Sequence, residues 1–239
     1  MLVLAETRGR VTQLTLSRDA KRNALSVELA RELIDALTTL PDDTRAVVLT
    51  GAGSCFCAGA DLGEDKIGDG FFDAFDELIA TLRSLPAPVI AHVNGPAIGA
   101  GMMLSMACDM RVLSETASLR IPVGDMAIGV NEWVVTALAD LVGGSRARLM
   151  LFSGAPLDAA DAVTCGYGVA GGIDDAWRLA EVVAAKAPLT QRNIKMQFAP
   201  DLFTAEQRHE ATMAPFSSED IREAARARAE KRAPRFAGS

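Results

Sequence analysis

Residues 94–109 read NGPAIGAGMMLSMACD, and the fold of the chain is best predicted from this stretch outward. An apolar run of strand length precedes it, and Gly95, Gly99 and Gly101 allow a tight turn and a close approach to the backbone. An apolar helix is predicted over 100–107, so the start of that helix leaves backbone N–H groups without partners. Because the positive end of the helix dipole lies there too, the pattern predicts a site for an anion, or for a carbonyl oxygen that becomes one during a reaction.

A second motif, GAGSCFCAGAD over residues 51–61, follows a strand predicted over 45–50. Its CFCAGAD portion stands about forty residues before the first motif. In this order and at this distance, the two motifs resemble those of the crotonase family, the enoyl-CoA hydratases and isomerases. The resemblance runs from near residue 10 into the C-terminal tail.

The resemblance implies an α/β fold in which repeated β-β-α turns form a spiral core, here residues 1–190. It also implies a helical C-terminal region, residues 191–239, that makes homotrimers, often paired into hexamers. The residue pattern also predicts an α/β fold, because predicted strands alternate with predicted helices over the first two thirds of the chain and helices dominate the rest. Such alternation favours a core of parallel strands.

The predicted elements follow from apolar periodicity and from capping residues. Strands are expected at residues 2–4, 11–16, 45–50, 88–93, 110–113 and 118–121. An amphipathic helix is expected over 71–85, and further helices over 174–187 and 218–232. Five other helices are expected to begin at the capping residues Ser26, Asn131, Ser145, Asp158 and Thr204.

Composition excludes several functional classes. The chain has 239 residues, a net charge of −7 and no apolar run of the roughly 18 residues that a membrane span needs. Because the N-terminus does not resemble a signal peptide, we expect a cytoplasmic protein with reduced cysteines, without nucleic-acid binding. The spacing of Cys55 and Cys57 and the presence of only two histidines, His92 and His209, argue against a zinc site, and no metal is expected.

The family resemblance implies an oxyanion hole made of two backbone N–H groups, those of Ala60 and Ala100. Asp61 is then expected to organise its loop rather than to transfer a proton. The other residues expected around the substrate are Ala58, Leu62 and Gly99. The alternative is that both glycine clusters are only tight turns.

The coenzyme A end of the ligand is expected at two basic segments. Lys21 and Arg22 stand in a loop where family members contact the nucleotide. The tail, EKRAPRF, resembles one that brings basic side chains and an aromatic ring to CoA, with the candidates Lys231, Arg232, Arg235 and Phe236. The alternative for the tail is a solvated basic helix end, which the helix dipole favours.

Hydration of an enoyl thioester needs a water activated for attack and a proton delivered to the neighbouring carbon, and the hydratases use two glutamates for this. At the two corresponding positions this chain has Met103 and Val123, which cannot transfer a proton. Asp125 and Glu132 are the nearest replacement candidates, although roles as a loop carboxylate and a first-turn helix acid explain them better than catalysis does. In this respect the chain resembles an actinobacterial enoyl-CoA hydratase paralogue without the usual glutamates.

The predicted function is therefore that of a crotonase-family acyl-CoA-binding protein, nominally an enoyl-CoA hydratase or isomerase of fatty-acid metabolism, with weak or absent crotonyl-CoA hydration. The only cofactor-like group expected is the coenzyme A thioester itself. An alternative is a non-catalytic acyl-CoA carrier that docks to a partner. A Rossmann dinucleotide-binding site is excluded because the motif lacks the third glycine. A serine peptidase with Ser105 as nucleophile would need a histidine base, and no histidine lies between His92 and His209.

Overall fold

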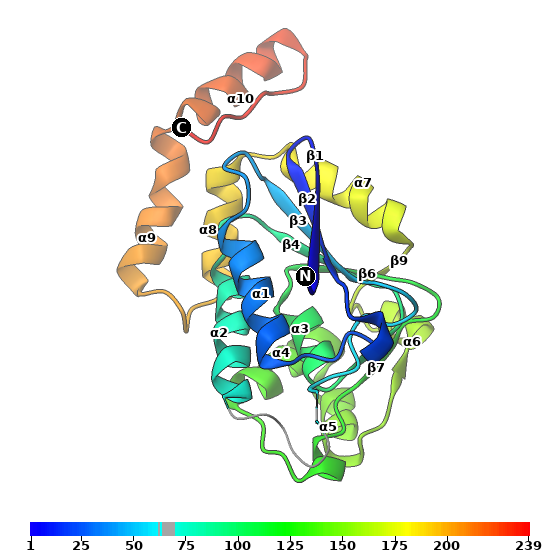
Figure 1. Ribbon diagram of the computed structural model, residues 1–239. Helices are drawn as coiled ribbons and strands as arrows, with labels where there is room; N and C mark the ends of the chain where they lie inside the picture. Colours follow the sequence, from blue (N-terminus) through cyan, green and yellow to red (C-terminus); the bar gives the residue numbers. More distant parts are fainter. Residues whose placement is uncertain (62, 64–69) are drawn as a thin grey trace.

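The computed structural model describes residues 1–61, 63 and 70–239. A six-stranded sheet with the order β1-β2-β3-β4-β6-β9 forms its centre, and a three-stranded sheet with the order β5-β7-β8 lies beside it (Figure 1). All pairs of neighbouring strands are parallel except β1 with β2 and β7 with β8. The strands are β1 (Val3–Arg8), β2 (Val11–Leu16), β3 (Ala46–Gly51), β4 (Val89–Val93), β5 (Pro96–Ile98), β6 (Met110–Leu113), β7 (Ser118–Arg120), β8 (Leu157–Asp158) and β9 (Val169–Ala170).

Successive turns of the chain stack on one another to form a spiral. β4 lies in the large sheet and β5 in the small one, and β6 and β7 repeat this division in the next turn. The same stacking continues outside the named strands, because Cys57 pairs with Ala97, Ala97 with Leu119, and Leu119 with Leu157. The predicted β-β-α spiral core is thus confirmed.

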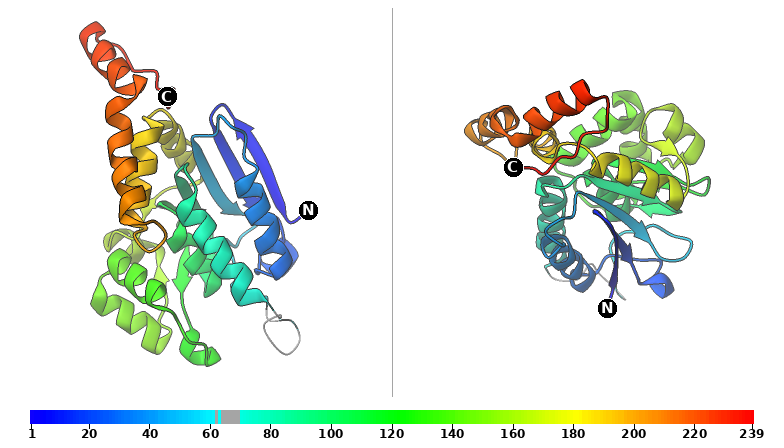
Figure 2. Two further views of the ribbon diagram at one scale, coloured as in Figure 1. Left: turned by 90° about the vertical axis from the view of Figure 1, so that its left-hand side faces the viewer. Right: turned by 90° about the horizontal axis from the view of Figure 1, so that it is seen from above.

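Helices cover both faces of the large sheet (Figures 1 and 2). α1 (Val27–Thr38), α2 (Phe71–Ser84) and α3 (Ala100–Ala107) share one hydrophobic core with the sheet, and α7 (Ile173–Ala184) forms a second on the opposite face. β3 is buried at every residue because it is covered on both sides, which is why its sequence is a continuous apolar run.

The remaining helical elements complete the list. They are η1 (Asp19–Lys21), η2 (Val123–Met126), α4 (Glu132–Val142), α5 (Gly144–Ser153), α6 (Ala159–Thr164), α8 (Pro188–Phe198), α9 (Ala205–Met213), η3 (Ala214–Ser217) and α10 (Glu219–Glu230). No helix of the described residues is long and apolar enough to cross a membrane.

Most helix starts follow the capping residues that the sequence predicts. Ser26, Asn131, Asp158 and Thr204 each accept a hydrogen bond from the first turn of a helix. The prediction for Ser145 is wrong: α5 begins one residue earlier, at Gly144, after the N-cap Gly143. The helix expected over 174–187 begins one residue earlier and ends at Ala184, because Pro188 starts α8.

The last helices extend away from the core, as Figures 1 and 2 show for α9 and α10. The final residues then return along α10, where Asp220 accepts hydrogen bonds from the N–H groups of Ala237 and Gly238. α8 instead packs against α2, and its buried Lys195 donates to Asp109 Oδ2 at 2.8 Å.

Candidate functional site

The two glycine motifs lie backbone against backbone. A Cβ atom added at Gly101 would stand 2.1 Å from Cys57 O, and one at Gly95 would stand 2.1 Å from Ser54 O. Any other residue at either position would push the two segments apart, so these glycines are required by close approach rather than by turn geometry alone. The sequence predicts a close approach to the backbone at these glycines, and this is confirmed: the approaching group is the backbone of the other motif.

Ala60 stands in a short parallel bridge with Leu25 that orients its N–H group. Leu25 N donates to Gly59 O at 2.8 Å, and Asp61 N donates to Leu25 O at 2.7 Å. Because successive backbone groups of an extended segment point to opposite sides, the N–H of Ala60 points away from Leu25. It has no hydrogen-bond partner among the described residues.

Ala100 is the first residue of α3, so its N–H has no partner within the helix. Gly99 before it adopts φ 53°, and its own N–H donates to Arg120 O at 2.7 Å. A Cβ atom added at Gly59 would stand 4.0 Å from Ala100 N, which places the start of α3 beside the segment that holds Ala60. Within the part of the chain that the structure describes, the N–H groups of Ala60 and Ala100 have no hydrogen-bond partner and lie on neighbouring segments, an arrangement that can hold one carbonyl oxygen.

Two asparagine side chains hold the first motif in place, and the sequence analysis assigned no role to either. Asn23 Nδ2 donates to Ala52 O at 2.9 Å and to Cys55 O at 2.7 Å. Asn94 Nδ2 donates to Gly51 O and Gly53 O, both at 2.9 Å. The residue type alone could have suggested these roles, because an amide side chain can form backbone-like hydrogen bonds with a loop that has no strand partner.

The basic loop before Leu25 adjoins this site. Arg22 O accepts a hydrogen bond from Ala58 N at 3.0 Å, so the segment that carries Lys21 and Arg22 runs beside the segment that carries Ala60. Both cations are exposed. The structure therefore brings together Lys21, Arg22, Ala58, Ala60, Asp61, Gly99 and Ala100, whereas Leu62 lies outside the described residues.

Asp61 is paired with a cation rather than free to exchange a proton. Arg18 Nη1 lies 2.6 Å from Asp61 Oδ2, and this guanidinium holds the pKa of the carboxyl below its usual range. The N–H of Gly63 also donates to Asp61 Oδ1 at 3.3 Å. A surface cavity of about 340 Å³ adjoins the pair; its lining includes Arg18, Ser26, Val27, Glu28, Asp61, Gly63 and Phe71.

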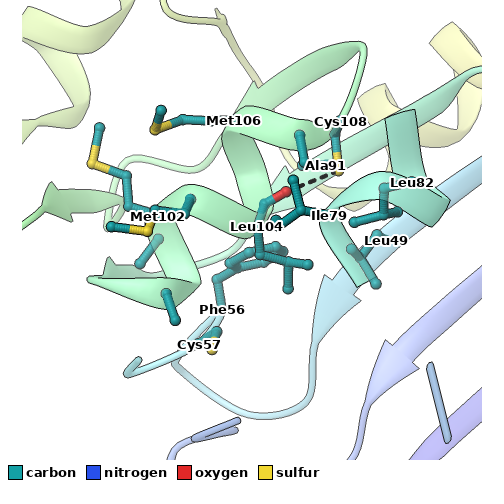
Figure 3. Close-up of a cluster of buried hydrophobic side chains, with 14 of the residues drawn as sticks. Leu49, Phe56, Cys57, Ile79, Leu82, Ala91, Met102, Leu104, Met106 and Cys108 are labelled. Atoms are coloured by element: carbon teal, nitrogen blue, oxygen red, sulfur yellow. Dashed lines mark hydrogen bonds between the residues drawn. The ribbon is translucent and has the colours of Figure 1, made fainter. Parts of the chain in front are cut away.

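Met103 and Val123, the positions at which the family resemblance leads us to expect glutamates, are both apolar. Met103 lies on α3 one turn after Ala100 and is 8% exposed, and Val123 begins η2 and packs against the main core. The other side chains of α3 are buried as well. Figure 3 shows Met102, Leu104 and Met106 packed with residues from other elements, among them Phe56, Ile79 and Leu82.

The two replacement carboxylates differ in their surroundings. Asp125 Oδ2 accepts a hydrogen bond from Arg120 Nη2 at 2.8 Å, and Arg120 Nε also donates to Gly154 O at 2.5 Å. Glu132 is exposed at the first position of α4, where the helix dipole stabilises a negative charge. Asp125 is thereby tied to the same arginine whose carbonyl holds Gly99.

The C-terminal tail lies at the other end of the sheet. Arg10 donates to Phe236 O at 3.3 Å, and Arg45 donates to Ala237 O at 2.6 Å. These arginines immediately precede β2 and β3, whereas Ala60 and Ala100 follow the carboxyl ends of β3 and β4. Within one chain the tail thus lies away from Ala60 and Ala100, and Arg232 is bound to Glu223 and Glu230. A role of Lys231, Arg232, Arg235 and Phe236 in binding CoA stays a prediction.

Ser105, Cys57 and Cys108 are buried, and their surroundings do not activate them as nucleophiles. Ser105 Oγ is hydrogen-bonded to Tyr167 Oη at 2.5 Å, so it lacks the base that a nucleophilic serine needs. Burial raises the pKa of the Cys57 and Cys108 thiols to about 12, which keeps both protonated. Within the described residues, no group of three or more His, Cys, Asp or Glu side chains could hold a metal ion.

Comparison with known proteins identifies the family. A profile described as enoyl-CoA hydratase/isomerase matches residues 6–239. The chain belongs to the enoyl-CoA hydratase/isomerase family. The family acts on CoA thioesters.

Relatives of this enoyl-CoA hydratase/isomerase family match the chain along almost its whole length. A Mycobacterium tuberculosis protein named "Probable enoyl-CoA hydratase echA6" is 38% identical over 234 residues, covering 96% of each chain. "Enoyl-CoA hydratase EchA19" of the same species is 32% identical over 98% of this chain and 95% of its own. A crystal structure of an enoyl-CoA hydratase from Bacillus anthracis superposes over all of both chains with a TM-score of 0.89 at 31% identity.

Proposed function

We propose that this protein binds acyl-CoA or enoyl-CoA thioesters with the carbonyl oxygen at the N–H groups of Ala60 and Ala100, and that it hydrates enoyl-CoA weakly or not at all. The observation that carries the proposal is the pair of N–H donors, without partners among the described residues, on the neighbouring segments that follow β3 and β5. Lys21 and Arg22, exposed on the neighbouring loop, are proposed to contact the phosphates of CoA.

Two backbone donors suit a thioester because its oxygen gains negative charge when the adjacent carbon is attacked or deprotonated. Donors that are fixed by the fold stabilise this charge without reorganising at the moment of reaction. The glycines and the amides of Asn23 and Asn94 support such fixation, since the glycines pack the two motifs against each other and the amides hold the backbone of residues 51–55.

Proton transfer is the step that the chain is poorly equipped to perform. Met103 and Val123 supply no acid or base, and Asp125 is engaged by Arg120. General acid–base help is worth about 10²–10⁴-fold for each positioned group. We therefore expect crotonyl-CoA hydration far below that of a hydratase with both glutamates, and we propose a non-catalytic carrier as the second candidate function.

The test is a hydratase assay over several acyl chain lengths, run beside direct measurement of acyl-CoA affinity. Tight binding with negligible turnover supports the proposal. Turnover of an ordinary hydratase contradicts it, and loss of that turnover in Asp125→Asn or Glu132→Gln would identify the acid in use. The double variant Met103→Glu, Val123→Glu gives the converse test, because a gain of hydration is expected if only the carboxylates are missing.

Ala100→Pro tests the donor itself. Proline is accommodated at the first position of a helix but removes the N–H group. We expect the folded variant to lose affinity for a thioester by about tenfold and to keep its affinity for free CoA, as the loss of one hydrogen bond to a partly charged oxygen predicts. Unchanged thioester affinity would exclude Ala100 as an oxyanion donor.

A further inference from the structure

Arg18 joins the two backbone segments that hold Ala60. Its Nη1 atom lies 2.6 Å from Asp61 Oδ2 and donates to Ala24 O at 3.0 Å. Ala24 precedes Leu25 in one segment, and Asp61 follows Ala60 in the other. The guanidinium therefore links the same two segments that the hydrogen bonds of Leu25 connect, and it does so directly beside the proposed donor.

The arginine is itself held in place from its backbone. Arg18 N donates to Asn23 Oδ1 at 2.9 Å, and Arg18 O accepts from Lys21 N at 2.9 Å and from Asn23 N at 3.0 Å. The side chains of the pair are only 24% and 22% exposed, for Arg18 and Asp61 respectively. A partly shielded ion pair whose partners are already ordered is screened less than a surface pair and loses less side-chain entropy.

The two charges of the pair offset each other beside a site that must accommodate negative charge. Were the guanidinium absent, the carboxylate of Asp61 would stand next to Ala60 without its counter-ion. Its negative charge would then oppose charge on a carbonyl oxygen bound at the Ala60 N–H group.

We propose, resting on the proposed function, that Arg18 is a positioning residue: through Asp61 it fixes the Ala60 N–H group and neutralises the carboxylate beside it. In this role Arg18 contributes to binding of the thioester carbonyl and not to binding of the CoA nucleotide. Asp61 correspondingly acts through the backbone that follows Ala60 and makes no contact with the substrate.

The experiment compares two ligands of the same length, hexanoyl-CoA and its thioether analogue S-hexyl-CoA, which lacks the carbonyl oxygen. The ratio of their dissociation constants, thioether over thioester, measures the contribution of the carbonyl. For the parent protein we expect a ratio of about 100, because each of the two hydrogen bonds contributes about tenfold. In Arg18→Gln the ratio should fall about tenfold, to the contribution of the Ala100 N–H group alone, while affinity for the thioether stays within about twofold of the parent value.

Conservative variants separate positioning from a general loss of structure. Arg18→Lys keeps the charge and should restore part of the ratio. Asp61→Asn weakens the contact with Arg18 without leaving an unpaired carboxylate, so it should lower the ratio through the positioning effect alone, by less than Arg18→Gln does. Because both residues act through one contact, the double variant should show no further loss. If Arg18→Gln does not fold, Asp61→Asn tests whether the Arg18–Asp61 pair positions the Ala60 N–H group.

Arg178→Gln is the matched control, since it removes an arginine–aspartate pair of 2.5 Å on α7, on the opposite face of the sheet from α3. It should leave the ratio unchanged. A parent protein with no preference for the thioester overturns the proposed function. A parent with the preference and an Arg18→Gln variant that retains it overturns the positioning role. Equal loss of both ligands overturns it too, because Arg18 would then contact CoA itself.

Discussion

At the scale of single residues, Gly101 leaves no room for a side chain. Since a Cβ atom there would stand 2.1 Å from Cys57 O and 2.8 Å from Cys57 Cβ, Gly101→Ala must displace either α3 or the segment before Ala60. We expect a loss of about 2–4 kcal/mol in the free energy of unfolding, as backbone overpacking in a core predicts, measured by urea denaturation. The preference for a thioester over a thioether should disappear with it.

Gly144→Ala is the control for this substitution. Its added Cβ would meet only the end of the Arg148 side chain, at 3.1 Å, and the position lies in the first turn of α5. Because alanine reduces the freedom of the unfolded chain, the variant should be neutral or more stable by less than about 1 kcal/mol. If Gly101→Ala were equally neutral, the close packing of the two motifs would be wrong.

His92 makes the stability of the protein depend on pH. Its Nδ1 is hydrogen-bonded with Thr50 Oγ1 at 3.0 Å, its Nε2 is buried without a partner among the described residues, and burial lowers its pKa. Below about pH 6.5 the unfolded chain binds a proton here that the folded chain does not. Stability should therefore fall as pH drops from 7 towards 5, by at most about 1.4 kcal/mol per pH unit.

The measurement is the free energy of unfolding of the parent and of His92→Gln at pH 7 and pH 5.5. Glutamine does not titrate, so the variant should lose less stability over this interval. The carboxyl groups of Asp61 and Asp201, whose pKa values their arginine partners lower, lose their contributions only below about pH 4. Identical losses in the two proteins would show that His92 is not the group responsible.

At the scale of secondary-structure elements, the sequence predicts what local chemistry decides. Ser26, Asn131 and Thr204 begin helices because a side-chain oxygen next to a free N–H is favourable in any surroundings. α3 is predicted with correct bounds because an uninterrupted apolar run follows Gly99. Ser145 is misplaced because the local pattern does not distinguish a capping serine from one inside the first turn.

Elements that depend on distant contacts could not be predicted in this way. β5 has only three residues, and it is a strand because β7 and the bridge at Cys57 lie beside it. The roles of Asn23 and Asn94 follow from carbonyl groups about thirty to forty residues away in sequence. The position of the tail depends on Arg10 and Arg45, which no local pattern connects with residues 236 and 237.

The attachment of α8 to the core gives a prediction at this scale. Lys195 is 5% exposed, and its Nζ donates to Asp109 Oδ2 at 2.8 Å and to Ala87 O at 3.2 Å. Lys195→Met should lower the free energy of unfolding by about 1–3 kcal/mol, because it leaves these acceptors without their cation. Lys186→Met, at an exposed position, should change it by less than about 0.5 kcal/mol, and an equal effect of both would exclude the ion pair as an attachment.

At the scale of the whole molecule, the helical region over 191–239 leaves large apolar side chains exposed. They are Ile194, Phe198, Met213, Phe216 and Ile221, and Phe198 is 83% exposed. Monomeric proteins seldom leave such a surface uncovered. We therefore predict that the protein is a trimer or hexamer in solution whose subunits meet through these helices.

Light scattering at micromolar concentration tests the assembly. Phe198→Glu should shift the mass towards the monomer, because it places a charge within the proposed contact. Val182→Glu, which changes a 55% exposed residue on α7, should leave the mass as it is. A monomeric parent protein would contradict the prediction.

The spiral also governs the order in which the chain can fold. Among the strands of the described residues, the β1–β2 hairpin alone pairs residues that are close in sequence. Each parallel pair from β2 to β6 forms only after a loop or helix between its strands has closed. Because each later turn pairs with the edge of the preceding one, we expect partly folded chains to expose an unpaired strand edge. Chains dominated by such non-local pairings refold in milliseconds to seconds or more slowly, and refolding yield should therefore fall as protein concentration rises.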